Sequence, residues 1–158
     1  MLQIKVCDFQ LTDSTILVCF DGAALSSGLC CGARGTFRAH QKRTTKWCLN
    51  CGAGTNNKAE LLGLWVSLSL AKFWNLNHIL VLGDSKLIID WINQNCKLNS
   101  VHLEGWKQET LKLSNNFSDI HFSHIPRTHN RAADALSKRA LSGVVGRLSV
   151  YHCDKGVE

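Results

Sequence analysis

Proline, low-complexity sequence and long apolar runs are nearly or wholly missing from this chain. It has one proline in 158 residues, and no repeat or composition change marks an internal linker. No stretch approaches the roughly 20 consecutive apolar residues of a membrane-spanning helix. Residues 1–10 also lack the basic start and apolar core of a secretory signal. We therefore expect one globular domain in the cytoplasm or nucleus, with no membrane partner.

Negatively charged residues are scarce as well. The chain has 12 Asp and Glu residues against 18 Lys and Arg residues, which gives a formal net charge of +6. Its composition, 45% hydrophobic and 19% charged, is sufficient for one sizeable core. A basic balance fits a polyanionic partner, but many soluble proteins are equally basic. The net charge alone therefore favours nucleic-acid binding only weakly.

The eight cysteines lack the spacing of a complete zinc site. Cys48 and Cys51 form one Cys-x-x-Cys pair, and Cys30 and Cys31 lie upstream. No second Cys-x-x-Cys or His-x-x-x-His pair follows at the spacing of a zinc finger or ribbon. We therefore expect free, mostly buried thiols in a reducing compartment.

The spacing of apolar residues predicts a series of strands and helices within residues 14–143. The expected strands span residues 15–20, 32–37, 47–53, 79–82 and 120–125, and the expected helices span 57–74, 85–94, 101–113 and 130–143. The order is β-β-β-α-β-α-α-β-α, and the first three strands are expected to form an antiparallel meander. Residues 1–13 and 144–158 show no clear periodicity and are expected to be less ordered flanks.

Four acidic residues stand at the boundaries of these elements. Asp21 follows the first expected strand, and Asp84 follows the fourth. Glu60 and Asp134 lie one turn into the first and last expected helices. In an α/β sheet, ligands gather where the carboxyl ends of strands meet the starts of helices. Four carboxylates at such a point would hold Mg²⁺, and two such ions about 3.5–4 Å apart activate water for phosphodiester cleavage.

Each of these acids also has a structural explanation. Asp21-Gly22 is a common turn dipeptide, and Glu60 forms a capping box with Asn57. Asp84 suits a helix cap, and Asp134 suits the first half of a helix. These explanations leave open why all four residues are expected at one end of one sheet. Their convergence therefore favours a metal site.

The segments that carry these acids resemble ribonuclease H of the type 1 family, which includes plant and retroelement RNase H-like domains. They are Phe20 to Ala23, Thr55 to Leu61, Leu82 to Ser85 and Asn130 to Leu136. The resemblance runs from about residue 17 to residue 141. It implies an α/β, RNase H-like fold, in which helices flank a five-stranded mixed sheet in the order 3-2-1-4-5. It also implies a catalytic, metal-binding tetrad for two Mg²⁺ ions, with Mn²⁺ as the alternative: Asp21, Glu60, Asp84 and Asp134.

The resemblance further implies an RNA–DNA hybrid as the substrate, whose RNA strand is cut to leave 5′-phosphate and 3′-hydroxyl ends. Asn56 and Asn57 would reach the minor groove, where the 2′-hydroxyl distinguishes RNA from DNA. Thr55 would hold a phosphate of the DNA strand. All three residue types are equally suited to cap a helix. Lys86 stands where many relatives carry Gln, and it is either a substrate contact or a solvated lysine.

Three features depart from the family pattern. Residues 24–31 replace a turn rich in Gly, Asn and Pro, and only residues 95–100 stand where relatives carry a basic protrusion. The loop before Asp134 is short, so His129 or Arg127 would serve in place of the family's histidine-containing loop. A basic segment is a further candidate for nucleic-acid binding, or else a solvated hairpin tip: it contains Arg34, Arg38, Lys42, Arg43 and Lys46.

Two functions remain open at this point. The first is a metal-dependent endonuclease that cuts the RNA strand of hybrids. The second is a non-catalytic module of the same fold, such as a retroelement remnant, that binds nucleic acid or protein. The complete tetrad favours the enzyme, because a binding module has no need to concentrate repelling carboxylates. Either would act as a monomer or as one domain of a polyprotein.

Overall fold

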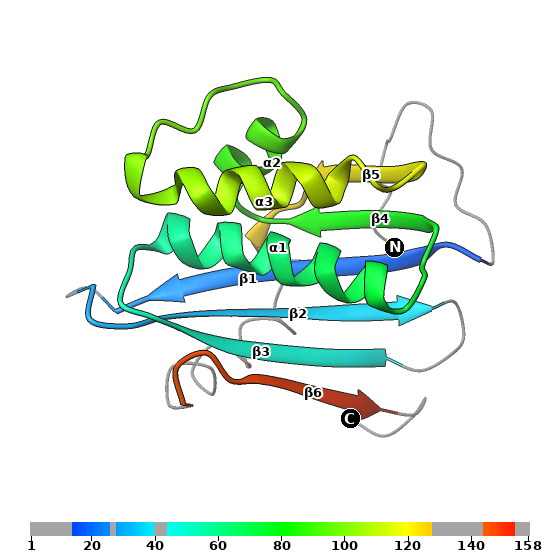
Figure 1. The fold of residues 1–158 in the computed structure, drawn as a ribbon. Helices are drawn as coiled ribbons and strands as arrows, with labels where there is room; N and C mark the ends of the chain where they lie inside the picture. The colour runs from blue at the N-terminus through cyan, green and yellow to red at the C-terminus, as the bar shows by residue number, and fades with distance from the viewer. Residues whose placement is uncertain (1–13, 26–27, 40–43, 128–143, 154–158) are drawn as a thin grey trace.

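The computed structural model describes residues 14–25, 28–39, 44–127 and 144–153, which form a six-stranded mixed sheet with helices packed on it. The strands are β1 (Ile16–Ala24), β2 (Cys31–Ala39), β3 (Thr44–Gly52), β4 (His78–Gly83), β5 (Asp119–His124) and β6 (Leu148–Cys153). The helices are α1 (Asn56–Phe73), α2 (Lys86–Ile92), the 3₁₀ turn η1 (Val101–Leu103) and α3 (Glu104–Ser114). Figure 1 shows α1 and α3 running side by side across the sheet.

The strand order confirms the sheet that the sequence predicts. The sheet reads β5-β4-β1-β2-β3-β6, which contains the expected order 3-2-1-4-5. The strands β1, β2 and β3 form the expected antiparallel meander. The strand β4 runs parallel to β1, with Phe20 opposite Gly83. The carboxyl end of β4 therefore lies beside Phe20 of β1, the residue directly before Asp21.

The sixth strand corrects the prediction of five strands and of a less ordered segment after residue 143. β6 pairs antiparallel with β3, with Leu49 opposite Leu148 and Thr44 opposite Cys153. It lies at the edge of the sheet farthest from β5 (Figure 1). Leu148 and Val150 are exposed, so the strand lacks the buried alternation by which a strand is recognised in a sequence.

The main core lies between the sheet and α1. Leu61, Leu64 and Leu68 of α1 are fully buried together with Val18 and Phe20 of β1. The helix α3 packs against α1 through Trp106 and Trp65, whose rings meet edge to face at 5.1 Å. The predicted helix over 101–113 is divided into η1 and α3. Residues 93–100 connect α2 to η1 without a further helix.

The described cysteines do not form a metal site. The six whose side chains are described are free thiols, and none belongs to a group of three possible metal ligands. Within the same residues, no helix is long and apolar enough to cross a membrane.

Candidate metal centre

Asp21 lies inside β1. It does not lie in a turn after the strand, although its Asp-Gly pair is typical of a turn. The strand continues to Ala24, and Asp21 and Gly22 pair with Arg34 and Ala33 of β2. The Asp21 side chain is buried, and its Oδ1 accepts a hydrogen bond of 2.8 Å from the Gly22 N–H. Its Oδ2 accepts a hydrogen bond from Nη2 of Arg34. The strand therefore fixes the direction of this carboxylate.

Gly22 allows the first turn of α1 to approach β1. A Cβ atom on Gly22 would lie 2.3 Å from the carbonyl carbon of Ala59 and 2.4 Å from the Glu60 nitrogen, so only glycine fits. This contact holds Glu60 beside Asp21. The Asp-Gly pair is typical of a turn, but here its glycine allows the backbones of β1 and α1 to come close together.

The predicted capping box of Asn57 and Glu60 is wrong. The helix α1 begins at Asn56, and its N-cap is Thr55, whose hydroxyl accepts a hydrogen bond from the Lys58 N–H at 3.2 Å. A cap two residues earlier places Glu60 past the first turn, where its side chain is buried. Glu60 therefore does not cap the helix.

Asp84 follows β4 directly and is half-buried. It is not the cap of α2, because Ser85 takes that role and accepts a hydrogen bond from the Ile88 N–H at 3.4 Å. The Asp84 carbonyl oxygen lies 3.1 Å from Nε2 of His124, at the end of β5. Two neighbouring parallel strands thus hold the backbone from which the Asp84 carboxylate projects.

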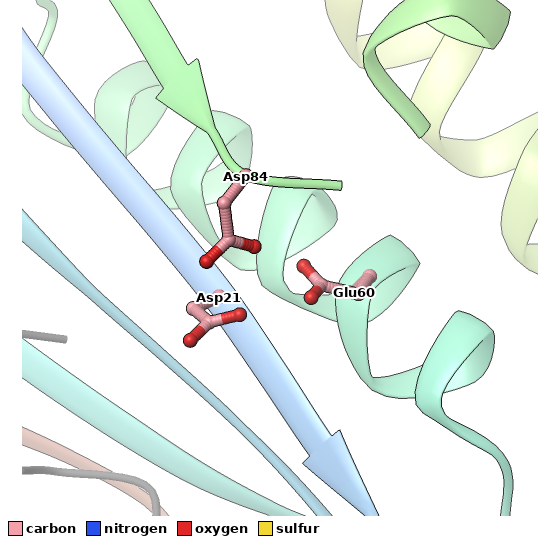
Figure 2. Close-up of side chains that lie close together, drawn as sticks. All are labelled: Asp21, Glu60 and Asp84. Atoms are coloured by element: carbon pink, nitrogen blue, oxygen red, sulfur yellow. The ribbon is translucent and has the colours of Figure 1, made fainter. Parts of the chain in front are cut away.

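The structure brings three of the four predicted acids together. One carboxylate oxygen from each of Asp21, Glu60 and Asp84 lies within 4.8 Å of the others. Figure 2 shows the three side chains pointing toward one another from β1, α1 and the end of β4. Asp134 and His129 lie outside the described residues.

The burial of this group and its neighbouring carboxylates strongly affect the ionisation of Glu60. Burial first, and then the neighbouring carboxylates of Asp21 and Asp84, raise the pKa of Glu60 from 4.5 to about 10, although the Gly22 backbone opposes the shift. Glu60 Oε2 is buried and has no hydrogen-bond partner within the part of the chain that the structure describes. A buried, unpartnered oxygen among three carboxylates fits a hard divalent cation such as Mg²⁺.

Arg34 is the residue at this site that sequence reasoning misplaced. It was grouped with a basic segment facing nucleic acid or solvent, but it is 1% exposed and forms a buried ion pair with Asp21. A signal existed in the sequence: Arg34 is the one charged residue in a run of small residues from Cys31 to Gly35. That run had been read as a strand only from Gly32 onward.

The residues predicted to contact a hybrid at the start of α1 are all exposed. Thr55 is the helix cap, and Asn56 Oδ1 accepts a hydrogen bond of 2.8 Å from the Ala24 N–H. Asn57 is exposed in the first turn of α1, as are its two neighbours before it. They lie one turn from Glu60, beside the acidic group.

The remaining predicted contacts are spread more widely. Lys86 is exposed at the start of α2 and pairs with Asp90 at 2.5 Å. Arg38 is exposed near the end of β2, and Arg127 is exposed after β5. Lys42 and Arg43 lie outside the described residues.

A mixed sheet in this order, with carboxylates gathered where two parallel strands end, defines an α/β protein with a candidate divalent-metal centre. The model of the family described as reverse transcriptase-like matches residues 19–140. The chain belongs to this family.

The chain is also similar to two ribonuclease H proteins. It is 32% identical over 90 residues to Ribonuclease HI of Halobacterium salinarum, a match covering 57% of this chain and 45% of that protein. The chain therefore matches less than half of that relative's length. The crystal structure of RNase H1 from the same organism superimposes with a TM-score of 0.74 at 26% identity, and covers 80% of this chain and 97% of that one.

A third comparison shows the same fold in a complex. The structure of LC11-RNase H1 with an RNA/DNA hybrid has a TM-score of 0.72 at 24% identity, and covers 80% of this chain and 96% of that one. The RNase H-like fold that the motifs predicted is therefore confirmed.

Proposed function

We propose that this chain is a metal-dependent endonuclease that hydrolyses the RNA strand of RNA–DNA hybrids and leaves 5′-phosphate and 3′-hydroxyl ends. The observation that carries the proposal is the convergence of Asp21, Glu60 and Asp84 within 4.8 Å. Burial and mutual repulsion of carboxylates cost stability, and a cation that binds all three recovers it. The similarity to Ribonuclease HI supports the assignment of the reaction.

Asp21, Glu60 and Asp84 would hold the cation, with Asp134 as the fourth predicted ligand. When bound, a divalent cation supplies Lewis-acid stabilisation of charge on a phosphodiester and lowers the pKa of bound water. Asp21 is fixed by its two hydrogen bonds, so its carboxylate needs little reorientation. Glu60 must lose its proton when the cation enters, because burial otherwise keeps it neutral.

The start of α1 would select the RNA strand. Its exposed residues lie one turn from Glu60, so a strand bound over the acidic group would also pass Asn56 and Asn57. Asn56 Oδ1 already accepts a hydrogen bond from the Ala24 N–H. Asn57 is therefore the better candidate for binding a 2′-hydroxyl. DNA lacks that group, and we expect it to be left uncut.

One observation favours the alternative of a non-catalytic hybrid-binding module. Arg34 pairs with one of the oxygens that Asp21 would offer to a metal. A permanent positive charge at this point partly satisfies the acidic group without any divalent ion.

A cleavage assay separates the two functions. Labelled RNA–DNA hybrid, RNA duplex and DNA duplex are incubated with the protein in Mg²⁺, in Mn²⁺ and in EDTA. We expect metal-dependent cutting of the RNA strand of the hybrid alone, and its loss in Asp84→Asn. Asp119→Asn is the matched control, because Asp119 begins β5 and contacts His78 and His121 away from the acidic group. Hybrid binding without cleavage in either metal would instead support the module.

A further inference from the structure

The contact between Arg34 and Asp21 follows from the register of the first two strands. The two residues are opposite each other in the antiparallel pairing of β1 and β2, so their side chains stand on the same face of the sheet. Nη2 of Arg34 donates to Oδ2 of Asp21, and the two side chains are 1% and 2% exposed. The pair is therefore part of the interior and not a surface ion pair.

The backbone around Arg34 is held in place by packing. A Cβ atom on the next residue, Gly35, would lie 2.6 Å from the Cys19 carbonyl oxygen and 2.6 Å from Nε1 of the fully buried Trp47. Ala33, on the other side, is fully buried as well. The backbone that carries Arg34 therefore cannot shift without disturbing the core.

The guanidinium changes the charge that a cation meets. Three carboxylates meet here, and arginine keeps its proton at every physiological pH. Asp21 has one oxygen bound by the Gly22 N–H and the other by Arg34. A divalent cation bound to Asp21 must therefore share an oxygen either with Arg34 or with the Gly22 N–H, and in both cases it enters against the positive charge of Arg34.

We infer that Arg34 is a positioning residue: it holds the Asp21 carboxylate in place in the metal-free protein, and it lowers the affinity of the acidic group for divalent cations. The inference rests on the proposed function only in taking the acidic group as a metal centre. It does not depend on whether the protein cuts a hybrid. Its consequence is a centre that fills at a higher Mg²⁺ or Mn²⁺ concentration than the carboxylates alone would require.

The test measures cation binding without substrate. Mn²⁺ affinity is determined by calorimetry and by electron paramagnetic resonance for the wild type, Arg34→Gln, Arg34→Lys and Arg38→Gln. Arg38 is the matched control, because it lies four residues further along β2 and is exposed. We expect Arg34→Gln to bind Mn²⁺ roughly tenfold or more tightly, since a fixed charge close to the ion is removed. Arg34→Lys should restore weak binding, and Arg38→Gln should bind as the wild type does.

The melting temperature without metal supplies a second readout. Arg34→Gln should melt several degrees lower than the wild type in EDTA and regain more of that loss on addition of Mn²⁺. If Arg34→Gln does not fold, Arg34→Met keeps the apolar stem without the charge, and the same tighter binding is expected. A folded Arg34→Gln or Arg34→Met protein that binds Mn²⁺ with wild-type affinity would overturn the inference.

The Mn²⁺ affinities and the cleavage assay together distinguish this inference from the proposed function. A wild type that binds Mn²⁺ more weakly than Arg34→Gln, yet never cuts a hybrid, contradicts the nuclease alone. A wild type that cuts hybrids while Arg34→Gln and Arg34→Met bind Mn²⁺ with unchanged affinity contradicts the role of Arg34 alone.

Discussion

The two aspartates of the acidic group have different surroundings, and their replacement should have different effects on stability. Asp21 is buried inside β1 and paired with Arg34. Asp84 is half-buried after β4. Relief of repulsion between carboxylates alone would leave either Asn variant as stable as the wild type, or slightly more stable. Because Asp21 belongs to a buried ion pair, we expect only Asp84→Asn to be as stable as the wild type or more stable.

Both Asp21→Asn and Asp84→Asn should abolish hybrid cleavage, but only Asp21→Asn should destabilise the fold. Loss of one member of a buried ion pair typically costs about 3–5 kcal/mol. Asp84→Asn should stay within about 1 kcal/mol of the wild type. Urea denaturation in EDTA measures both free energies of unfolding. An Asp21→Asn protein as stable as the wild type would show that the pair with Arg34 contributes nothing.

Glu60 should make the metal-free protein less stable as the pH rises. Its pKa is about 10 in the folded protein, against an ordinary value of 4.5, so the folded state holds a proton that the unfolded state has lost between these values. Stability from this group is therefore lost progressively as the pH rises from about 4.5 toward 10. Glu60→Gln mimics the neutral form and should be more stable at pH 8 by at least about 1 kcal/mol.

Thermal melts at pH 5 and pH 8, with EDTA or Mg²⁺, measure this effect. In EDTA, the wild type should lose more stability than Glu60→Gln between the two pH values. Mg²⁺ should stabilise the wild type at pH 8 and have little effect on Glu60→Gln. Equal pH dependence of the two proteins would place the Glu60 carboxylate in contact with water.

At the scale of elements, the centre depends on how closely α1 approaches β1. The contact at Gly22 sets the position of Glu60 relative to Asp21. The hydrogen bond from the Ala24 N–H to Asn56 joins the end of β1 to the start of α1. The acidic group and the exposed start of α1 are therefore positioned by the same contacts between β1 and α1.

Gly22→Ala should force α1 away from the sheet. Its Cβ would meet backbone atoms of Ala59 and Glu60 at 2.3 and 2.4 Å, and neither can yield without movement of the helix. We expect a loss of about 2–4 kcal/mol in stability and weaker Mn²⁺ binding. Gly105→Ala in α3 is the matched control, because nothing lies within 4 Å of its Cβ position. It should be neutral or slightly stabilising. If Gly22→Ala behaves like Gly105→Ala, the close contact does not shape the centre.

Local patterns predicted the elements well, and pairings distant in sequence explain what they missed. The buried runs of β1 and β4 and the apolar spacing of α1 are properties of neighbouring residues, so they can be read directly. The partnership of Arg34 with Asp21 depends on the register of two strands, which no local pattern contains. Thr55 and Asn57 are both good caps, and the structure shows that Thr55 takes this role. β6 becomes a strand through its pairing with β3.

At the scale of the whole molecule, the net charge of +6 should attract the hybrid. Replacing Arg38, Lys42 and Arg43 together by Gln should weaken hybrid binding and reduce the slope of log affinity against log salt by about 2. The control replaces three exposed basic residues elsewhere, Lys72, Lys112 and Arg147, by Gln. Fluorescence anisotropy from low to high salt measures both slopes. If the two triple variants behave alike, Arg38, Lys42 and Arg43 attract the hybrid only through the net charge of the protein.

The pairing of β6 with β3 has a consequence for the order in which the molecule assembles. Its partners are separated by about 100 residues of chain, so closing this pairing carries a larger entropy cost than closing the β2–β3 hairpin. None of the three gathered carboxylates lies on β6. We expect β6 amide protons to exchange with solvent faster than those of β1 and β4, and Mn²⁺ to slow exchange only in the latter. The outer strand would then dock last and detach first, while the residues of the acidic group stay assembled.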